Sequence, residues 1–145
     1  MILTATRTLN DRLRQVPTWP VYVAGAVLPA WYFWLGMNGG LGVEPIRELE
    51  HRLGEAGLIM LMLTLTVSPL RRFTGLNLIR FRRALGLIAF YYIICHLLVW
   101  LILDVQILDQ IWKDILKRPY ITIGMVGFLL LIPVALTSNN LSIRK

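Results

Sequence analysis

The chain has 145 residues, of which 57% are hydrophobic and 16% charged, and its formal net charge is +7. A soluble domain of this length is rarely so apolar, and the charged residues gather in clusters between long uncharged runs. The single cysteine, Cys95, excludes an internal disulfide and a cysteine metal cluster. The composition therefore indicates a membrane protein.

Four uncharged runs predict membrane-spanning helices. A helix rising 1.5 Å per residue needs about 20 apolar residues to cross a hydrocarbon core about 30 Å thick. The second run is too short, so we expect its helix to extend back through the sequence ELEHRLGE. No run alternates polar with apolar residues as barrel strands do. The prediction is an all-α membrane protein, a transmembrane bundle of four spans, built on residues 16–43, 56–70, 84–103 and 119–143.

The distribution of Lys and Arg predicts the orientation, because these residues resist translocation. Ten of them lie before the first run, after the second run and in the tail, whereas five lie in the opposite loops. We therefore expect 1–18 to be a cytoplasmic segment, 19–137 the transmembrane domain and 138–145 a cytoplasmic tail. Membrane lipid at the inner leaflet accounts for the positive charge, and no nucleic-acid partner is expected.

Both loops on the opposite side carry apolar residues at helical spacing. Pro45 suits a helix start and is followed by such a pattern, which predicts a short interfacial helix leading into the second span. The second loop, DVQILDQIWKDILKRP, predicts an amphipathic helix in the membrane plane. The helix around Trp112 would help to dock a partner.

His96 lies within the apolar sequence FYYIICHLLVWLILD, at a depth where ionisable side chains are costly and usually mark a function. Leu85, Ala89, Tyr92 and Trp100 share its helical face, and Gly86 and Ile93 border it. Gly and Ala at one level of this strip and aromatic residues at another leave room for a flat ligand. Haem iron is commonly bound by histidine, so haem would fit such a face. The alternative is a structural histidine that donates one hydrogen bond to a neighbouring helix.

Three further residues are candidate cofactor contacts. Arg82 lies fourteen residues before His96 on the same side of the helix, and it or Arg83 would pair with a haem propionate or with the inner-leaflet surface. His51, at the outer interface, would be a second ligand or merely solvated. Two histidines do not make the usual zinc site, and hydrolytic or nucleotide motifs are not apparent in the sequence.

Four segments carry a family resemblance: GGLGVEPIRELEHRLGEAGL, LTLTVSPLRR, LIRFRRALGLIAFYYIICHLLVWLILD and KRPYITIGMVGFLLLIPVALTSN. In this order they resemble the MsrQ (YedZ) family, the haem-binding membrane subunits of bacterial MsrPQ methionine sulfoxide reductase systems. The resemblance begins near Trp19. It implies a ferric-reductase-like transmembrane domain with haem b, and the family's haem histidine in this helix falls on His96.

The resemblance also implies a role in the bacterial inner membrane. The chain would be an electron-transfer subunit that takes electrons from a quinone or a flavin donor and passes them to a periplasmic MsrP-like molybdopterin reductase. Reduction of methionine sulfoxide would occur on that partner. FMN is also associated with the family, although no residue of this chain matches a flavin site.

The family pattern continues beyond the position of LTSNNLSIRK, so the resemblance predicts a C-terminally shortened chain. Two-histidine ligation of one haem would then need His51, a second copy of the chain or further sequence.

Two other functions also fit the residues. A small transport or proton-relay protein would use His96 in a polar path, but the spans offer hydroxyls and no carboxylate at mid-depth. A membrane anchor subunit without redox activity would need only the four spans. An absorbance scan with added haem would distinguish the three functions.

Overall fold

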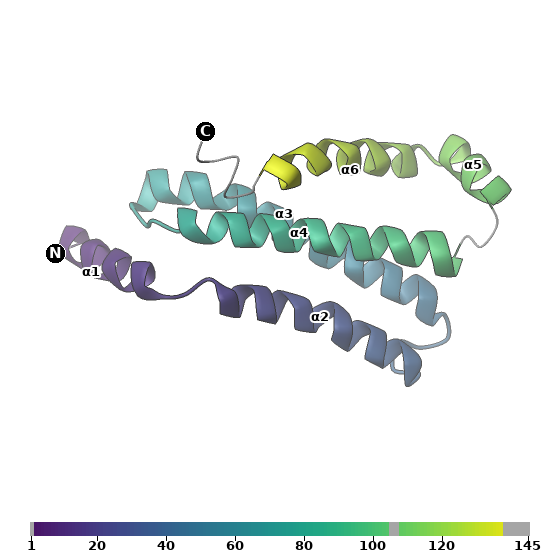
Figure 1. Cartoon of the computed structure of the whole chain (residues 1–145), viewed down its shortest axis with the longest axis horizontal. Helices are drawn as coiled ribbons and strands as arrows, with labels where there is room; N and C mark the ends of the chain where they lie inside the picture. The colour runs from purple at the N-terminus through teal and green to yellow at the C-terminus, as the bar shows by residue number, and fades with distance from the viewer. Residues whose placement is uncertain (1, 105–107, 138–145) are drawn as a thin grey trace.

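The structure is a computed structural model that describes residues 2–104 and 108–137. Its regular elements in these ranges are all helices, and no strand occurs among the described residues (Figure 1). The prediction of an all-α protein is therefore confirmed. In chain order the elements are α1 (Ile2–Gln15), α2 (Trp19–Met37), α3 (Pro45–Thr74), α4 (Ile79–Val99), the π-helical turn η1 (Trp100–Asp104), α5 (Leu108–Lys117) and α6 (Pro119–Thr137).

Four helices in the described part of the chain are long and apolar enough to cross a membrane: α2, α3, α4 continued by η1, and α6. This confirms the four predicted spans, while the predicted tail 138–145 lies outside the described residues. α3 has 30 residues and is therefore about 45 Å long. The predicted backward extension of the second span is confirmed, and the short helix expected before it is the first part of α3.

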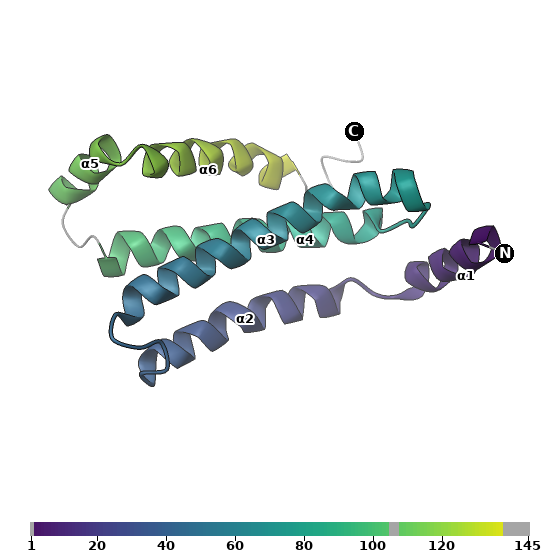
Figure 2. The same ribbon diagram turned by 180° about the vertical axis from the view of Figure 1, so that it is seen from behind.

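The helices run antiparallel, with α3 and α4 at the centre of the bundle (Figures 1 and 2). α2 packs against this pair on one side, and α6 contacts α4 on the other. We call the end with the α3–α4 loop, residues 75–78, the proximal end, and the end with the α2–α3 loop, residues 38–44, the distal end. α1 lies at the proximal end, where α6 also ends.

Glycines let α4 pack closely against its neighbours. A Cβ atom on Gly57 of α3 would lie 3.2 Å from Ile93 Cγ1, and one on Gly25 of α2 would lie 2.8 Å from two carbons of Ile88. In a membrane, helices associate through such close van der Waals packing, because lipid tails are as apolar as the helix surfaces. The backbones of α2, α3 and α4 are thus held together by contacts that larger residues would prevent.

A cluster of buried residues lies at the distal side of this three-helix core: Leu41, Leu49, Leu53 and Val99, with Tyr32, Leu35 and Cys95 packed against it. α6 is different, because none of its residues is buried. It contacts α4 through the stacked rings of Phe90 and Phe128, whose centroids are 5.8 Å apart. Buried side chains are therefore found on α2, α3 and α4 and not on α6.

The segment before the first span, expected only to be cytoplasmic, contains helix α1. Asn10 of α1 donates its Nδ2–H to the Gly75 carbonyl oxygen at 3.0 Å, and its Oδ1 accepts the Asn77 N–H at 2.9 Å. Gly75 caps α3 with a φ of 75°, in the left-handed region that favours glycine. One asparagine thus joins α1 to the α3–α4 loop.

The loop after α4 contains the predicted amphipathic helix as α5. Residues 105–107 of that loop lie outside the described part of the chain. Trp112 and Leu116 of α5 are strongly exposed. The helix is confirmed, and its position in the membrane plane stays a prediction.

Candidate functional site

His96 lies in the last turn of α4, and its ring nitrogen Nδ1 is 2.8 Å from the backbone carbonyl oxygen of Glu50 in α3. A carbonyl oxygen can only accept a hydrogen bond, so Nδ1 carries the proton and donates it. In a neutral imidazole the other nitrogen, Nε2, then keeps its lone pair. The contact therefore fixes both the ring orientation and the atom that is able to bind a metal.

Gly54 makes this contact possible. A Cβ atom at position 54 would lie 3.1 Å from His96 Nδ1 and 3.2 Å from Cε1, which is tighter than ordinary contacts. Gly54 follows Glu50 by one helical turn, so both residues are on the face of α3 that meets the imidazole. The histidine thus lies flat against the α3 backbone at a position where any larger residue would displace it.

The face around His96 is more closely packed than predicted. Ala89, Tyr92 and Trp100 are 1%, 0% and 6% exposed, so the expected open strip for a flat ligand is wrong. The reason is α3, whose glycine positions allow it to pack directly on this face. His96 itself is half-buried. Because Tyr92 and Trp100, one turn before and after it, are buried, a ligand can reach the imidazole only at the depth of His96 itself.

His51 follows Glu50 directly, so its backbone lies near the His96 contact, but its side chain is exposed. Arg82 and Arg83 lie in the first turns of α4 at the proximal end, where Arg82 is exposed and Arg83 half-buried. Fourteen residues of helix separate Arg82 from His96, about 21 Å. That is farther than the propionate edge of a macrocycle lies from its iron. The structure therefore does not bring the two arginines and His96 to one haem.

The donor set around His96 fits haem iron rather than a bare metal ion. Among residues 2–104 and 108–137, no group of three or more His, Cys, Asp or Glu side chains could hold a metal ion. A single imidazole with its Nδ1–H engaged is, however, what a macrocycle-bound iron requires from a protein at one axial position. The geometry at His96 thus meets the requirement for one axial ligand.

Glu50 and Gly54 were not among the residues predicted for the site. Their contribution is a backbone carbonyl and the absence of a side chain, neither of which a sequence pattern displays. What the sequence does show is that Glu50 and Gly54 are four positions apart at the charged interfacial segment HRLGE. Such spacing places both on one helical face, but it does not indicate which partner that face meets.

Residues 53–145 match the protein family described as ferric reductase like transmembrane component. The protein-methionine-sulfoxide reductase heme-binding subunit MsrQ of Agrobacterium fabrum is 51% identical over 139 residues, which are 95% of this chain and 65% of the relative. The MsrQ of Brucella ovis is 52% identical over 137 residues, 94% of this chain and 62% of the relative. No solved structure matches the chain.

The chain thus spans less than two thirds of the length of these relatives. The family match nevertheless covers more than half of the chain and includes α4 with His96. The resemblance predicted from the sequence is confirmed, because about half of the aligned positions are identical in each of these relatives. The chain is a multi-pass membrane protein that belongs to the ferric reductase like transmembrane family and is similar, within it, to the MsrQ heme-binding subunits.

Proposed function

We propose that the chain is a haem-binding electron-transfer subunit in which Nε2 of His96 is an axial ligand of haem b iron. The hydrogen bond from Nδ1 to the Glu50 carbonyl oxygen is the observation that carries the proposal. Histidines that bind metals usually donate their other ring N–H to a carbonyl or carboxylate, which orients the ring and raises its basicity. When bound, haem supplies a one-electron carrier.

The chain's own residues would serve that carrier in three ways. His96 holds the iron, and the Glu50 carbonyl keeps the imidazole in the tautomer that binds it. Gly54 lets the ring lie against α3. Buried Tyr92 and Trp100, each one turn from His96, exclude water from the adjoining levels of α4. A dry surrounding with a fixed ligand favours electron transfer over loss or exchange of the cofactor.

The proposed electron route runs from a quinone or flavin donor to a periplasmic MsrP-like molybdopterin reductase. The relatives' names support the methionine sulfoxide reductase system as the destination. We place the chain in the bacterial inner membrane with both termini in the cytoplasm, supported by the excess of Lys and Arg at the proximal end. α5, with exposed Trp112 and Leu116, then offers a periplasmic surface for the partner.

The remaining predicted cofactor contacts take different roles in this proposal. Arg82 and Arg83 at the proximal end pair with lipid phosphates of the inner leaflet or with propionates of a second haem. His51, with an exposed side chain next to Glu50, is the candidate for a further ligand from α3. FMN is a further proposed cofactor, supported by family likeness alone.

Haem titration of two histidine variants tests the proposal. His96→Ala is expected to remove most of the Soret absorbance of the purified protein, because the imidazole that is proposed to bind the iron is lost. His51→Ala tests whether this exposed imidazole is the further ligand: a shifted or weakened Soret band would show that it is, and an unchanged band that it is not. A His96→Ala protein with an unchanged spectrum would refute the assignment and leave a membrane anchor as the function.

A further inference from the structure

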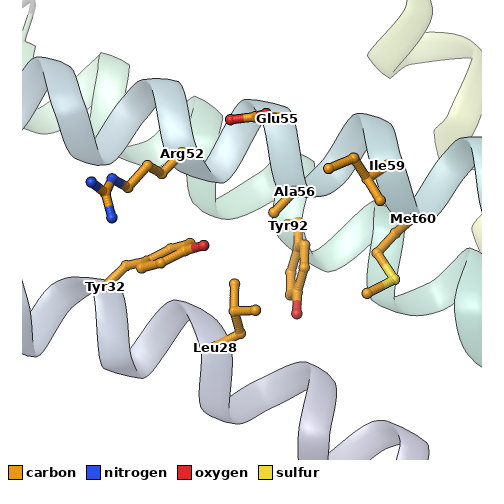
Figure 3. A pocket seen from close by; sticks show the side chains of 8 residues that line it. All are labelled: Leu28, Tyr32, Arg52, Glu55, Ala56, Ile59, Met60 and Tyr92. Atoms are coloured by element: carbon orange, nitrogen blue, oxygen red, sulfur yellow. The ribbon is translucent and has the colours of Figure 1, made fainter.

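A cavity of about 280 Å³ lies between α2, α3 and α4, and His96 is not among the residues that line it (Figure 3). The residues that line it are Leu28, Tyr32, Arg52, Glu55, Ala56, Ile59, Met60 and Tyr92. On α3 the lining runs over nine residues from Arg52 to Met60, about 12 Å along the helix. Arg52 and Tyr32 lie toward its distal end, while the Tyr92 hydroxyl and the side chains of Leu28, Ile59 and Met60 lie deeper. The cavity is thus amphipathic along its length.

Tyr92 gives the cavity a buried hydrogen-bond donor. Its side chain is 0% exposed, and its hydroxyl has no hydrogen-bond partner in the structure. A buried hydroxyl without a partner is costly, so native proteins nearly always supply one. The cavity is much larger than the share of about 30 Å³ that a water molecule occupies in the liquid. An occupant with an acceptor oxygen at this depth would remove the cost.

Arg52 and its ion-pair partner Glu48 lie at the distal mouth. The Nε–H of Arg52 is donated to Glu48 Oε1 at 2.7 Å, and its guanidinium carbon lies 5.8 Å from the centre of the Tyr32 ring. A guanidinium has four further N–H donors, which suit a phosphate. The Glu48 carboxylate keeps acceptor sites for a positive group, so the mouth presents one anion beside one cation. Figure 3 shows Arg52 over Tyr32, with Glu55 on the outer side of α3.

We propose that this cavity binds one phospholipid with an amine headgroup, of the phosphatidylethanolamine type, from the leaflet at the distal end. Its phosphate pairs with Arg52, and its ammonium group lies near Glu48. An ester carbonyl of its glycerol part accepts the Tyr92 hydroxyl, and an acyl chain follows Leu28, Ile59 and Met60. The volume suits the glycerol-ester part, while the rest of both chains stays in the bilayer.

The order of chemical groups in the cavity selects this ligand class. Along α3 from the distal end come Glu48, Arg52 and then Ile59 and Met60, and Tyr92 of α4 lies beside Gly57. Carboxylate, guanidinium, phenol and aliphatic side chains thus follow in the order of ammonium, phosphate, ester and acyl chain. An anionic headgroup such as phosphatidylglycerol offers no partner for the Glu48 carboxylate and would be repelled by it. The membrane supplies the phospholipid at high local concentration, so a modest affinity suffices for occupancy.

Native mass spectrometry of the full chain, prepared without haem, tests the proposal. Delipidated protein is titrated with phosphatidylethanolamine or phosphatidylglycerol, and the fraction carrying one lipid is measured. We expect one phosphatidylethanolamine to be bound in preference to phosphatidylglycerol. Tyr92→Phe should weaken its binding about fivefold through loss of one hydrogen bond. Arg52→Gln should weaken it further, because the phosphate loses its cation.

Tyr120→Phe is the matched control, since Tyr120 is an exposed phenol on α6 that does not line the cavity. Its lipid binding should equal that of the unchanged chain. Equal binding of the Tyr92→Phe protein, equal or tighter binding of phosphatidylglycerol, or no retained lipid at all would each overturn the proposal. Because haem is absent from the experiment, none of these results bears on the role of His96.

Discussion

α4 and α6 are nearly equal in hydropathy but differ in what they do in the bundle. The spans that contain them have mean hydropathies of 2.3 and 2.1. α4 buries Ala84, Ile88, Ala89, Tyr92 and Val99, whereas α6 buries no residue. The difference follows from the neighbours: glycines of α2 and α3 face α4, while Gly124 and Gly127 of α6 face open space. Hydropathy therefore identifies a span, and close packing decides which span can carry a site.

The largest effect that this comparison predicts is at Gly54. Gly54→Ala would place a methyl group 3.1 Å from His96 Nδ1, push the imidazole off the Glu50 carbonyl and loosen the proposed iron ligand. Loss of such an orienting contact typically costs about 10- to 100-fold in affinity. We expect haem affinity, measured by Soret titration, to fall by that amount.

Gly124→Ala on α6 is the matched control, because a Cβ atom there has no neighbour within 4 Å. Haem affinity in this variant should stay within about twofold of the unchanged chain, as expected for a surface substitution. If both variants bound haem equally well, the contact between Gly54 and His96 would have no role in ligation.

A smaller effect is expected on stability at Gly25. Gly25→Ala would bring a methyl group to 2.8 Å from the Ile88 side chain, closer than packed carbons tolerate. Overpacking of this kind costs about 1–3 kcal/mol. Unfolding in mixed micelles should therefore begin at lower denaturant concentration, with the same slope.

Gly127→Ala provides the comparison on α6, where the added methyl group meets open space. Alanine is the better helix former by up to about 1 kcal/mol, so this variant should be unchanged or slightly more stable. Destabilisation of the α6 variant by as much as the α2 variant would show that α6 packs as tightly as α4.

The smallest effect is expected at Asn10, whose amide makes both hydrogen bonds to the α3–α4 loop. Exposed hydrogen bonds contribute about 0.5–1.5 kcal/mol each at most. Asn10→Ala should leave global unfolding nearly unchanged and speed amide hydrogen exchange in α1 and at Asn77. Asn38→Ala, which loses only a bond to the Trp34 carbonyl within its own turn, should leave exchange in α1 as it was.

The spans could be predicted because a single physical quantity, the length of an uncharged run, determines whether a helix can cross a membrane. The short apolar run of the second span predicted its backward extension for the same reason, and Pro45 was predicted as a helix start because proline suits the first turn. α1 was missed because its sequence, with three arginines, has no apolar run, and its docking depends on Asn10 meeting a loop 65 residues away.

The candidate site was predicted in part. His96 was found because a buried ionisable residue stands out in an apolar span, whereas its partner Glu50 acts through a carbonyl that every residue possesses. The open face expected beside His96 was wrong because helical periodicity shows which residues share a face but not which helix covers it. The role of Gly54 can be recognised only once α3 and α4 are known to be in contact at that position.

The most direct test of the account is chemical rescue of His96→Gly with free imidazole. Replacing the side chain by a hydrogen leaves a gap of the right shape beside the Glu50 carbonyl, in which imidazole can donate one N–H and bind iron with its other nitrogen. We expect the Soret band to be lost in this variant and restored by imidazole. A His96→Gly protein that binds haem fully without imidazole would contradict the assignment of His96 as the iron ligand.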